Sequence, residues 1–330
     1  MDGLKIYYKF RNGDYLVVPA DGFLVNGKCV DICREDEMKI DFNPYHDKRG
    51  RFTTKAGSSG GASGGAFVRP KEMYLWDFPK KDGETSKEWL ARFEAAKQEQ
   101  DDYMDSFYKE SEDRLKQYIG KHSMPMNLRD ELEPEVVKDL ADNLDAFAKL
   151  HPEIKGAIDF IRTDELPTRT VAQFTLTMNH GNGIELNKKY YKDRKTLKEI
   201  HKMDLETNYH TQGTDEGQYF QHELAHALNE KMDSVLFKKG LDAAFKPNGN
   251  GVNKLRDVNL AKELYDKVYA EQGVDGIAVN VSRYATTNAK EFFAECMAES
   301  VNSPNPRPMA TQVAKEFREL IKAKEALLEG

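Results

Sequence analysis

The 330-residue chain carries a formal net charge of −7, and 32% of its residues are charged. This acidic balance argues against nucleic acid or an anionic membrane as the main partner, and no apolar run is long enough to span a bilayer. No signal peptide is recognisable, and three cysteines are too few for a disulfide framework. We therefore expect a soluble globular protein in a reducing, intracellular compartment.

The first 150 residues divide into three predicted parts. Residues 1–54 begin with short runs that alternate apolar and polar side chains between Asn-Gly and Asp-Gly turns, which predicts a small β-rich region of hairpins. Residues 55–67 are rich in glycine and serine, as is typical of a flexible linker. Residues 68–150 are predicted to be a helical segment, with helices over 85–118 and 134–150.

Residues 151–330 are predicted to form one α+β domain. Strands are expected at 157–161 and 171–178, and a turn leads from the second to a third strand at 184–187. A helix that starts near Asp215 is predicted to run to about Phe237. Further helices are expected near 258–270, around the sequence EFFAE and at 311–328.

The helix that starts near Asp215 contains the sequence HELAH. His222 and His226 are four residues apart, so both imidazoles leave one face of the helix and can converge on one metal ion. Glu223 follows the first histidine, where a carboxylate can reach a water near the metal without ligating it. This HExxH arrangement is typical of zinc peptidases, although the same residues could simply lie on the exposed face of a helix.

A catalytic zinc site needs a third protein ligand. The sequence ALNEKM after His226 excludes the HExxHxxGxxH pattern, and the KPNGNG segment about twenty residues downstream contains no glutamate. The remaining candidates are His180, His201, His210 and Glu291. We expect each histidine to be solvated, because His180 lies in a turn, His201 on a lysine-rich helix and His210 in a polar loop. Glu291 is favoured because it opens a helix with two core phenylalanines, although it could instead complete a capping box with Asn288.

The sequence YATTNAKEFFAE at residues 284–295, together with HELAH, resembles the catalytic domain of the anthrax toxin lethal factor family of gluzincins. Those enzymes place a tyrosine seven residues ahead of a zinc-binding glutamate, in the context Y-x-x-T-N-x-x-E-F-F-A-E. The resemblance covers about residues 160–305. It implies a zincin-like catalytic domain with a small mixed sheet and active-site helices, preceded here by the helical segment and the N-terminal β region.

The resemblance also implies a role for each matching residue. It assigns the zinc ligands His222, His226 and Glu291, the general base Glu223, the transition-state-stabilising phenol Tyr284, and Glu295 as a residue that supports a ligand imidazole. The strand at 171–178 is our prediction for an edge strand that aligns the substrate. Because 65 residues separate His226 from Glu291, residues 241–253 are predicted to be an insertion near the cleft.

A second resemblance concerns DFNPYHDKRGRFTTKAGSSGG at residues 41–61, which is similar to segments of head-morphogenesis proteins of tailed bacteriophages. The leading hypothesis is a zinc-dependent endopeptidase encoded by a phage or prophage, located in the bacterial cytoplasm or the virion. Its expected partners are a peptide or protein substrate and phage structural proteins. One alternative is a virion structural protein that uses a zincin domain for assembly. Another is a self-processing protein that cleaves its own linker at residues 56–66.

Overall fold

The computed structural model describes residues 67–71, 73–120, 128–177 and 181–328, together with the backbone of four strands near the N-terminus. The chain divides into two compact units, residues 1–57 with 70–72, and residues 58–69 with 73–330. The first unit contains the strands β1 (Ile6–Lys9), β2 (Tyr15–Val18), β3 (Leu24–Val25) and β4 (Lys28–Cys29). Each pairs antiparallel with the next, which confirms the predicted hairpins. The phage-like segment at 41–61 lies outside the described residues.

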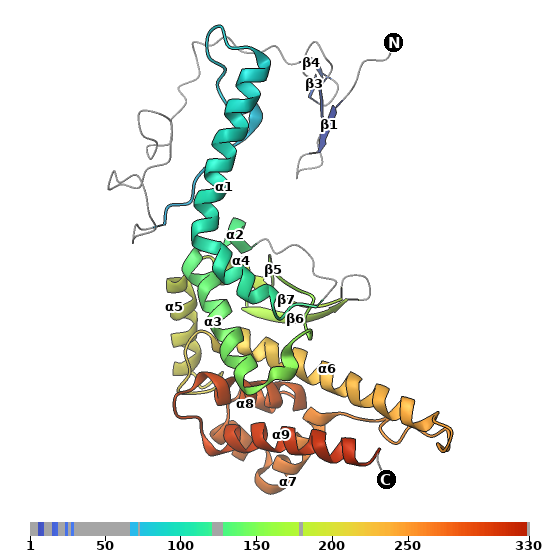
Figure 1. The fold of residues 1–330 in the computed structure, drawn as a ribbon. Helices are drawn as coiled ribbons and strands as arrows, with labels where there is room; N and C mark the ends of the chain where they lie inside the picture. Colours follow the sequence, from blue (N-terminus) through green and yellow to red (C-terminus); the bar gives the residue numbers. More distant parts are fainter. Residues whose placement is uncertain are drawn as a thin grey trace. The chain divides into compact units, whose positions relative to one another are not determined.

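The second unit contains the helices of the described chain and a small sheet (Figure 1). Its helices are α1 (Ser86–Lys116), α2 (Leu128–Glu131), α3 (Pro134–Leu150), α4 (Lys188–Tyr191), α5 (Arg194–Glu206), α6 (Gln218–Ala244), α7 (Leu260–Asn280), α8 (Ala289–Asn302) and α9 (Pro308–Ala326), with the short 3₁₀ segments η1 (Leu75–Asp77), η2 (Pro152–Ile154) and η3 (Tyr284–Thr286). The mixture of helices and strands confirms the α+β class. Among the described residues, no helix has the length and apolar content that crossing a bilayer requires.

The sheet has three strands in the order β5-β7-β6. β5 (Phe160–Asp164) runs parallel to β7 (Gly181–Asn187), and β6 (Ala172–Thr177) runs antiparallel to it, so the sheet is mixed and β6 forms one edge. β5 begins three residues later than predicted, because a turn at Gly156, whose φ is 71°, still occupies the chain there.

Helix α6 lies between the sheet and the C-terminal helices (Figure 1). It contacts β6 and β7 on one side, and α8 and α9 on the other. Phe292 and Phe293 of α8 are fully buried in this core, and Phe293 lies 4.8 Å from the ring of Phe317 in α9. The apolar pair in EFFAE therefore attaches α8 to the helices around it, as expected from the sequence.

Helices α6 and α7 are longer than predicted, and a glycine lies in the added part of each. Gly240 lies within α6, and a Cβ there would come 2.1 Å from Oδ1 of Asn253, so the missing side chain lets the following loop pack directly on the helix. Gly273 adopts φ 66° within α7 and joins two helical stretches across a kink. The helix continues through Gly240 in α6, whereas at Gly273 one helical stretch of α7 ends and a second begins.

Candidate metal centre

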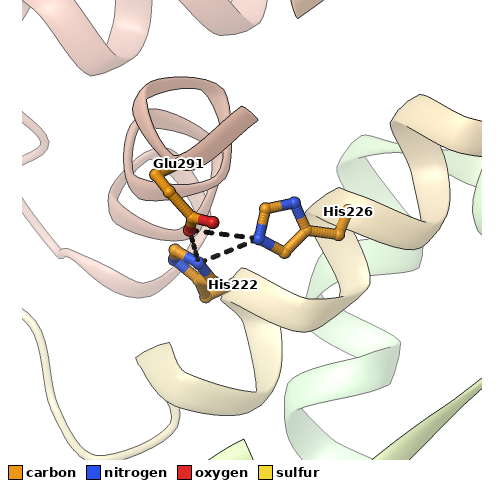
Figure 2. A group of neighbouring side chains, drawn as sticks. All are labelled: His222, His226 and Glu291. Carbon is orange, nitrogen blue, oxygen red and sulfur yellow. Dashed lines mark hydrogen bonds and ion pairs between the residues drawn. The ribbon is translucent and has the colours of Figure 1, made fainter. Parts of the chain in front are cut away.

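Helices α6 and α8 bring together three of the predicted site residues. The i, i+4 spacing on α6 places the Nε2 atoms of His222 and His226 3.1 Å apart. The first turn of α8 supplies Glu291, whose Oε2 lies 2.9 Å from Nε2 of His222 and 3.3 Å from Nε2 of His226. Figure 2 shows the three side chains converging from the two helices.

The capping of α8 leaves Glu291 available for this cluster. The Asn288 side chain accepts hydrogen bonds from the backbone N–H groups of Lys290 and Glu291, and so caps the helix by itself. The Glu291 carboxylate turns to the histidines instead of returning to the backbone of Asn288, as a capping box would require. The Glu291 carboxylate therefore contacts His222 and His226 and does not take part in a capping box.

The donor set fits a zinc ion. Two imidazole nitrogens and one carboxylate oxygen form a common set of protein ligands for catalytic zinc. Ligand atoms at about 2.0–2.1 Å from one tetrahedral ion lie roughly 3.3 Å from one another. The three separations here, 2.9, 3.1 and 3.3 Å, are close to that spacing. His222 is 5% exposed, so little of its ring is open to water.

Charge inside this cluster is strongly coupled. Burial on its own raises the pKa of the Glu291 carboxyl, but hydrogen bonds from His222 and His226 outweigh burial and hold that pKa far below its usual range. For His222, burial lowers the pKa of the imidazole, while Glu291 and Glu295 raise it, and the net pKa lies well above the ordinary value. Glu291 is therefore ionised, which is the form that ligates a metal.

Glu295 lies one turn beyond Glu291 and is 2% exposed. Its Oε2 accepts hydrogen bonds from the Thr211 backbone N–H at 3.0 Å and the Ser282 hydroxyl at 2.8 Å. Its Oε1 lies 2.8 Å from Nδ1 of His210 and 2.9 Å from Nδ1 of His222, the latter outside hydrogen-bond geometry. Glu295 thus contacts the ring nitrogen of His222 that faces away from the cluster, which agrees with the position that the resemblance implies for it.

Of the three other histidine candidates, His201 and His210 are described by the structure, and neither joins the cluster of His222, His226 and Glu291. The prediction that His210 is solvated is wrong, because its side chain is only 13% exposed and bonds to Glu295. The same prediction is wrong for His201, which is 6% exposed and packs against Tyr219. His201 is covered by Tyr219 of α6 and His210 is bonded to Glu295 of α8, and no local pattern in the sequence reveals these contacts between separate elements. His180 lies outside the described residues.

Glu223 is 9% exposed and faces the sheet edge. Its Oε2 accepts a hydrogen bond of 2.7 Å from the backbone N–H of Phe174 in β6. The Phe174 N–H therefore points away from β7. Because backbone groups alternate in direction along an antiparallel pair, those of Ala172 and Leu176 point the same way. The edge of β6 thus faces the HELAH residues.

Tyr284 is the first residue of η3 and lies next to His222 of the cluster. Its ring is 5.7 Å from the ring of His222 and 5.1 Å from that of His210, and its backbone N–H donates to the carbonyl of Tyr209. Burial raises the pKa of the Tyr284 phenol well above its usual value, and the carboxylates of Glu291 and Glu223 raise it further. The phenol is therefore a permanent hydrogen-bond donor at neutral pH.

Two cavities meet at these residues. A cavity of about 560 Å³ extends from His222, Glu223 and Tyr284 toward α5, and one of about 430 Å³ extends past His226 and Glu291 toward Leu176. Neither is lined by residues 241–253. The prediction that this segment lies near the cleft is wrong, because α6 continues to Ala244 and carries it about 27 Å along the helix axis from His226.

Comparisons with protein-family models, curated proteins and solved structures find no match to this chain. Function must therefore be inferred from the residues of the site.

Proposed function

We propose that this protein is a zinc-dependent endopeptidase of the gluzincin type, with a zincin-like catalytic domain. The observation that carries the proposal is the convergence of His222, His226 and Glu291 on one point, from two helices that also position Glu223. These residues would hold a zinc ion, which would supply a Lewis acid for the peptide carbonyl and for an adjacent water. A site with only a structural role would need neither Glu223 nor Tyr284.

The edge of β6 is the proposed binding surface for the substrate backbone. The outward backbone groups of Ala172 and Leu176, together with the Phe174 carbonyl, can pair with an extended peptide, while the Phe174 N–H stays bonded to Glu223. Antiparallel pairing is the more stable arrangement. In that direction the residues before the scissile bond lie in the 430 Å³ cavity and the residues after it lie in the 560 Å³ cavity.

Glu223 and Tyr284 are the proposed catalytic residues. Glu223 takes a proton from the attacking water and delivers it to the nitrogen of the leaving amine. The Phe174 N–H donates to one oxygen of this carboxylate and so orients the other. The Tyr284 hydroxyl donates a hydrogen bond to the oxyanion that develops on the scissile carbonyl, a contribution of about 3 kcal/mol if it resembles other such donors.

The proposal is tested with Glu223→Gln in the full chain. Gln keeps the side-chain shape but cannot accept the proton of water, so peptide cleavage should fall by at least about a thousandfold while zinc content stays at one ion per chain. Asp242→Asn, an exposed carboxylate on the same helix, is the matched control and should cleave like the wild type. Cleavage by Glu223→Gln at the wild-type rate would refute the mechanism.

A further inference from the structure

The larger cavity has a carboxylate in its wall that the proposed chemistry does not use. Asp204 in the last turn of α5 lines this cavity, and its side chain is 20% exposed. Its Oδ2 accepts a hydrogen bond from the hydroxyl of Tyr219 and lies 3.9 Å from Nε2 of His210. Within the described chain, Oδ1 of Asp204 accepts no hydrogen bond and forms no ion pair.

Asp204 is close to the proposed catalytic residues without touching them. His210 lies between Asp204 and the metal centre, since its Nδ1 bonds to Glu295 and its ring lies 6.1 Å from the ring of His222. Tyr219 is buried, and burial together with its bond to Asp204 raises the pKa of its phenol, so it stays a donor and leaves the negative charge on Asp204. A side chain that enters the cavity next to the scissile bond therefore meets the Asp204 carboxylate, whose Oδ1 has no partner within the described chain.

The remaining walls suit the stem of a long side chain. Val171, Tyr190 and Ile200 supply apolar surface between the β6 edge and α5. Lysine and arginine bury an apolar stem and place a cation at its end, so such a cavity matches them better than it matches a short or an acidic side chain. Arg169 also lines the cavity, but it is exposed, and water screens its charge more than that of the half-buried Asp204.

We propose that Asp204 is a specificity-determining residue that selects lysine or arginine directly after the scissile bond. This inference rests on the proposed endopeptidase function and on antiparallel pairing of the substrate with β6. It assigns the 560 Å³ cavity to the basic side chain, with Oδ1 of Asp204 as its partner.

The test compares peptides that differ only at the residue after the cleaved bond, which is Lys, Met or Glu. The full-length zinc protein should cleave the Lys peptide with a kcat/KM at least about tenfold above that of the Met peptide. Asp204→Asn keeps the acceptor for Tyr219 but removes the charge, and should bring this ratio close to one while the Met peptide is cleaved within about twofold of the wild-type rate. Glu206→Gln, exposed two residues further along α5, is the matched control and should keep the preference.

Binding of the same peptides to Glu223→Gln separates recognition from turnover. The Lys peptide should bind this variant at least about tenfold more tightly than the Met peptide, and the added Asp204→Asn change should remove the difference. Equal or better cleavage of Met or Glu peptides by the wild type would overturn the inference while leaving the endopeptidase intact. Preference for Glu that disappears in Arg169→Ala would assign the cavity to acidic side chains instead. Absence of cleavage of every peptide by the zinc-loaded wild type would refute the proposed function, and the specificity inference with it.

Discussion

Glu295→Gln tests whether the predicted support of the His222 imidazole is real. The carboxylate is 2% exposed, and it accepts hydrogen bonds from the Thr211 N–H, the Ser282 hydroxyl and Nδ1 of His210. Burial on its own raises the pKa of Glu295, but the charge and hydrogen bond of His210, with the contact to His222, hold that pKa far below its usual range. Three hydrogen-bond donors therefore stabilise the buried negative charge of Glu295.

Gln has the same shape as Glu but only one acceptor oxygen. If that oxygen accepts from Thr211 and Ser282, the NH₂ group faces the two imidazoles; if it accepts from the imidazole side, the NH₂ group faces the Thr211 and Ser282 donors. We expect a loss of about 3 kcal/mol in the free energy of unfolding, from the weakened bonds to a buried charged group. Zinc affinity should fall about 10- to 100-fold, because His222 loses the carboxylate that orients its ring.

The two effects are measured separately. Urea unfolding followed by circular dichroism gives the free energy of unfolding, and competition with a chromophoric chelator gives the zinc affinity. Glu319→Gln, an exposed carboxylate on α9, is the control and should change neither. If Glu295→Gln leaves the zinc affinity within about twofold and stability within about 0.5 kcal/mol of the wild type, the reasoning from these contacts is wrong.

Two further predictions concern stability away from the metal centre. His151 is 1% exposed with no partner on either ring nitrogen in the described chain, and burial, aided by Arg318, lowers its pKa to about 4. Because the unfolded histidine binds its proton near pH 6.5, this residue adds stability above pH 6.5 that is lost as the pH falls toward 4, up to about 3 kcal/mol. His151→Leu should therefore flatten the unfolding free energy over that range, and an unchanged slope would contradict this. Arg307→Ala should cost about 3–5 kcal/mol in urea unfolding, because it leaves Glu299, which is fully buried, without its ion-pair partner. Lys315→Ala, from an exposed pair, should cost under about 1 kcal/mol, and an equal loss in both variants would refute the argument.

Local spacing in the sequence was sufficient for part of the centre. The four-residue spacing of His222 and His226 brings two imidazoles to one helix face whatever the rest of the fold does. The apolar character of Phe292 and Phe293 likewise determined that α8 is held in the core, with Glu291 at its first turn. The helices over 86–116 and 134–150 were also predictable, because their apolar positions and start signals lie within each segment.

Tertiary structure decided what these residues meet. Glu291 could have capped its own helix, and only the packing of α6 against α8 gives its carboxylate two histidines. His210 and Glu295 are 85 residues apart, so their bond has no signature in a local pattern. The contact of Glu223 with the β6 edge and the place of Asp204 in the cavity depend equally on how separate elements pack. Spacing along one helix is set by covalent geometry, whereas contacts between elements depend on the packing of the whole core.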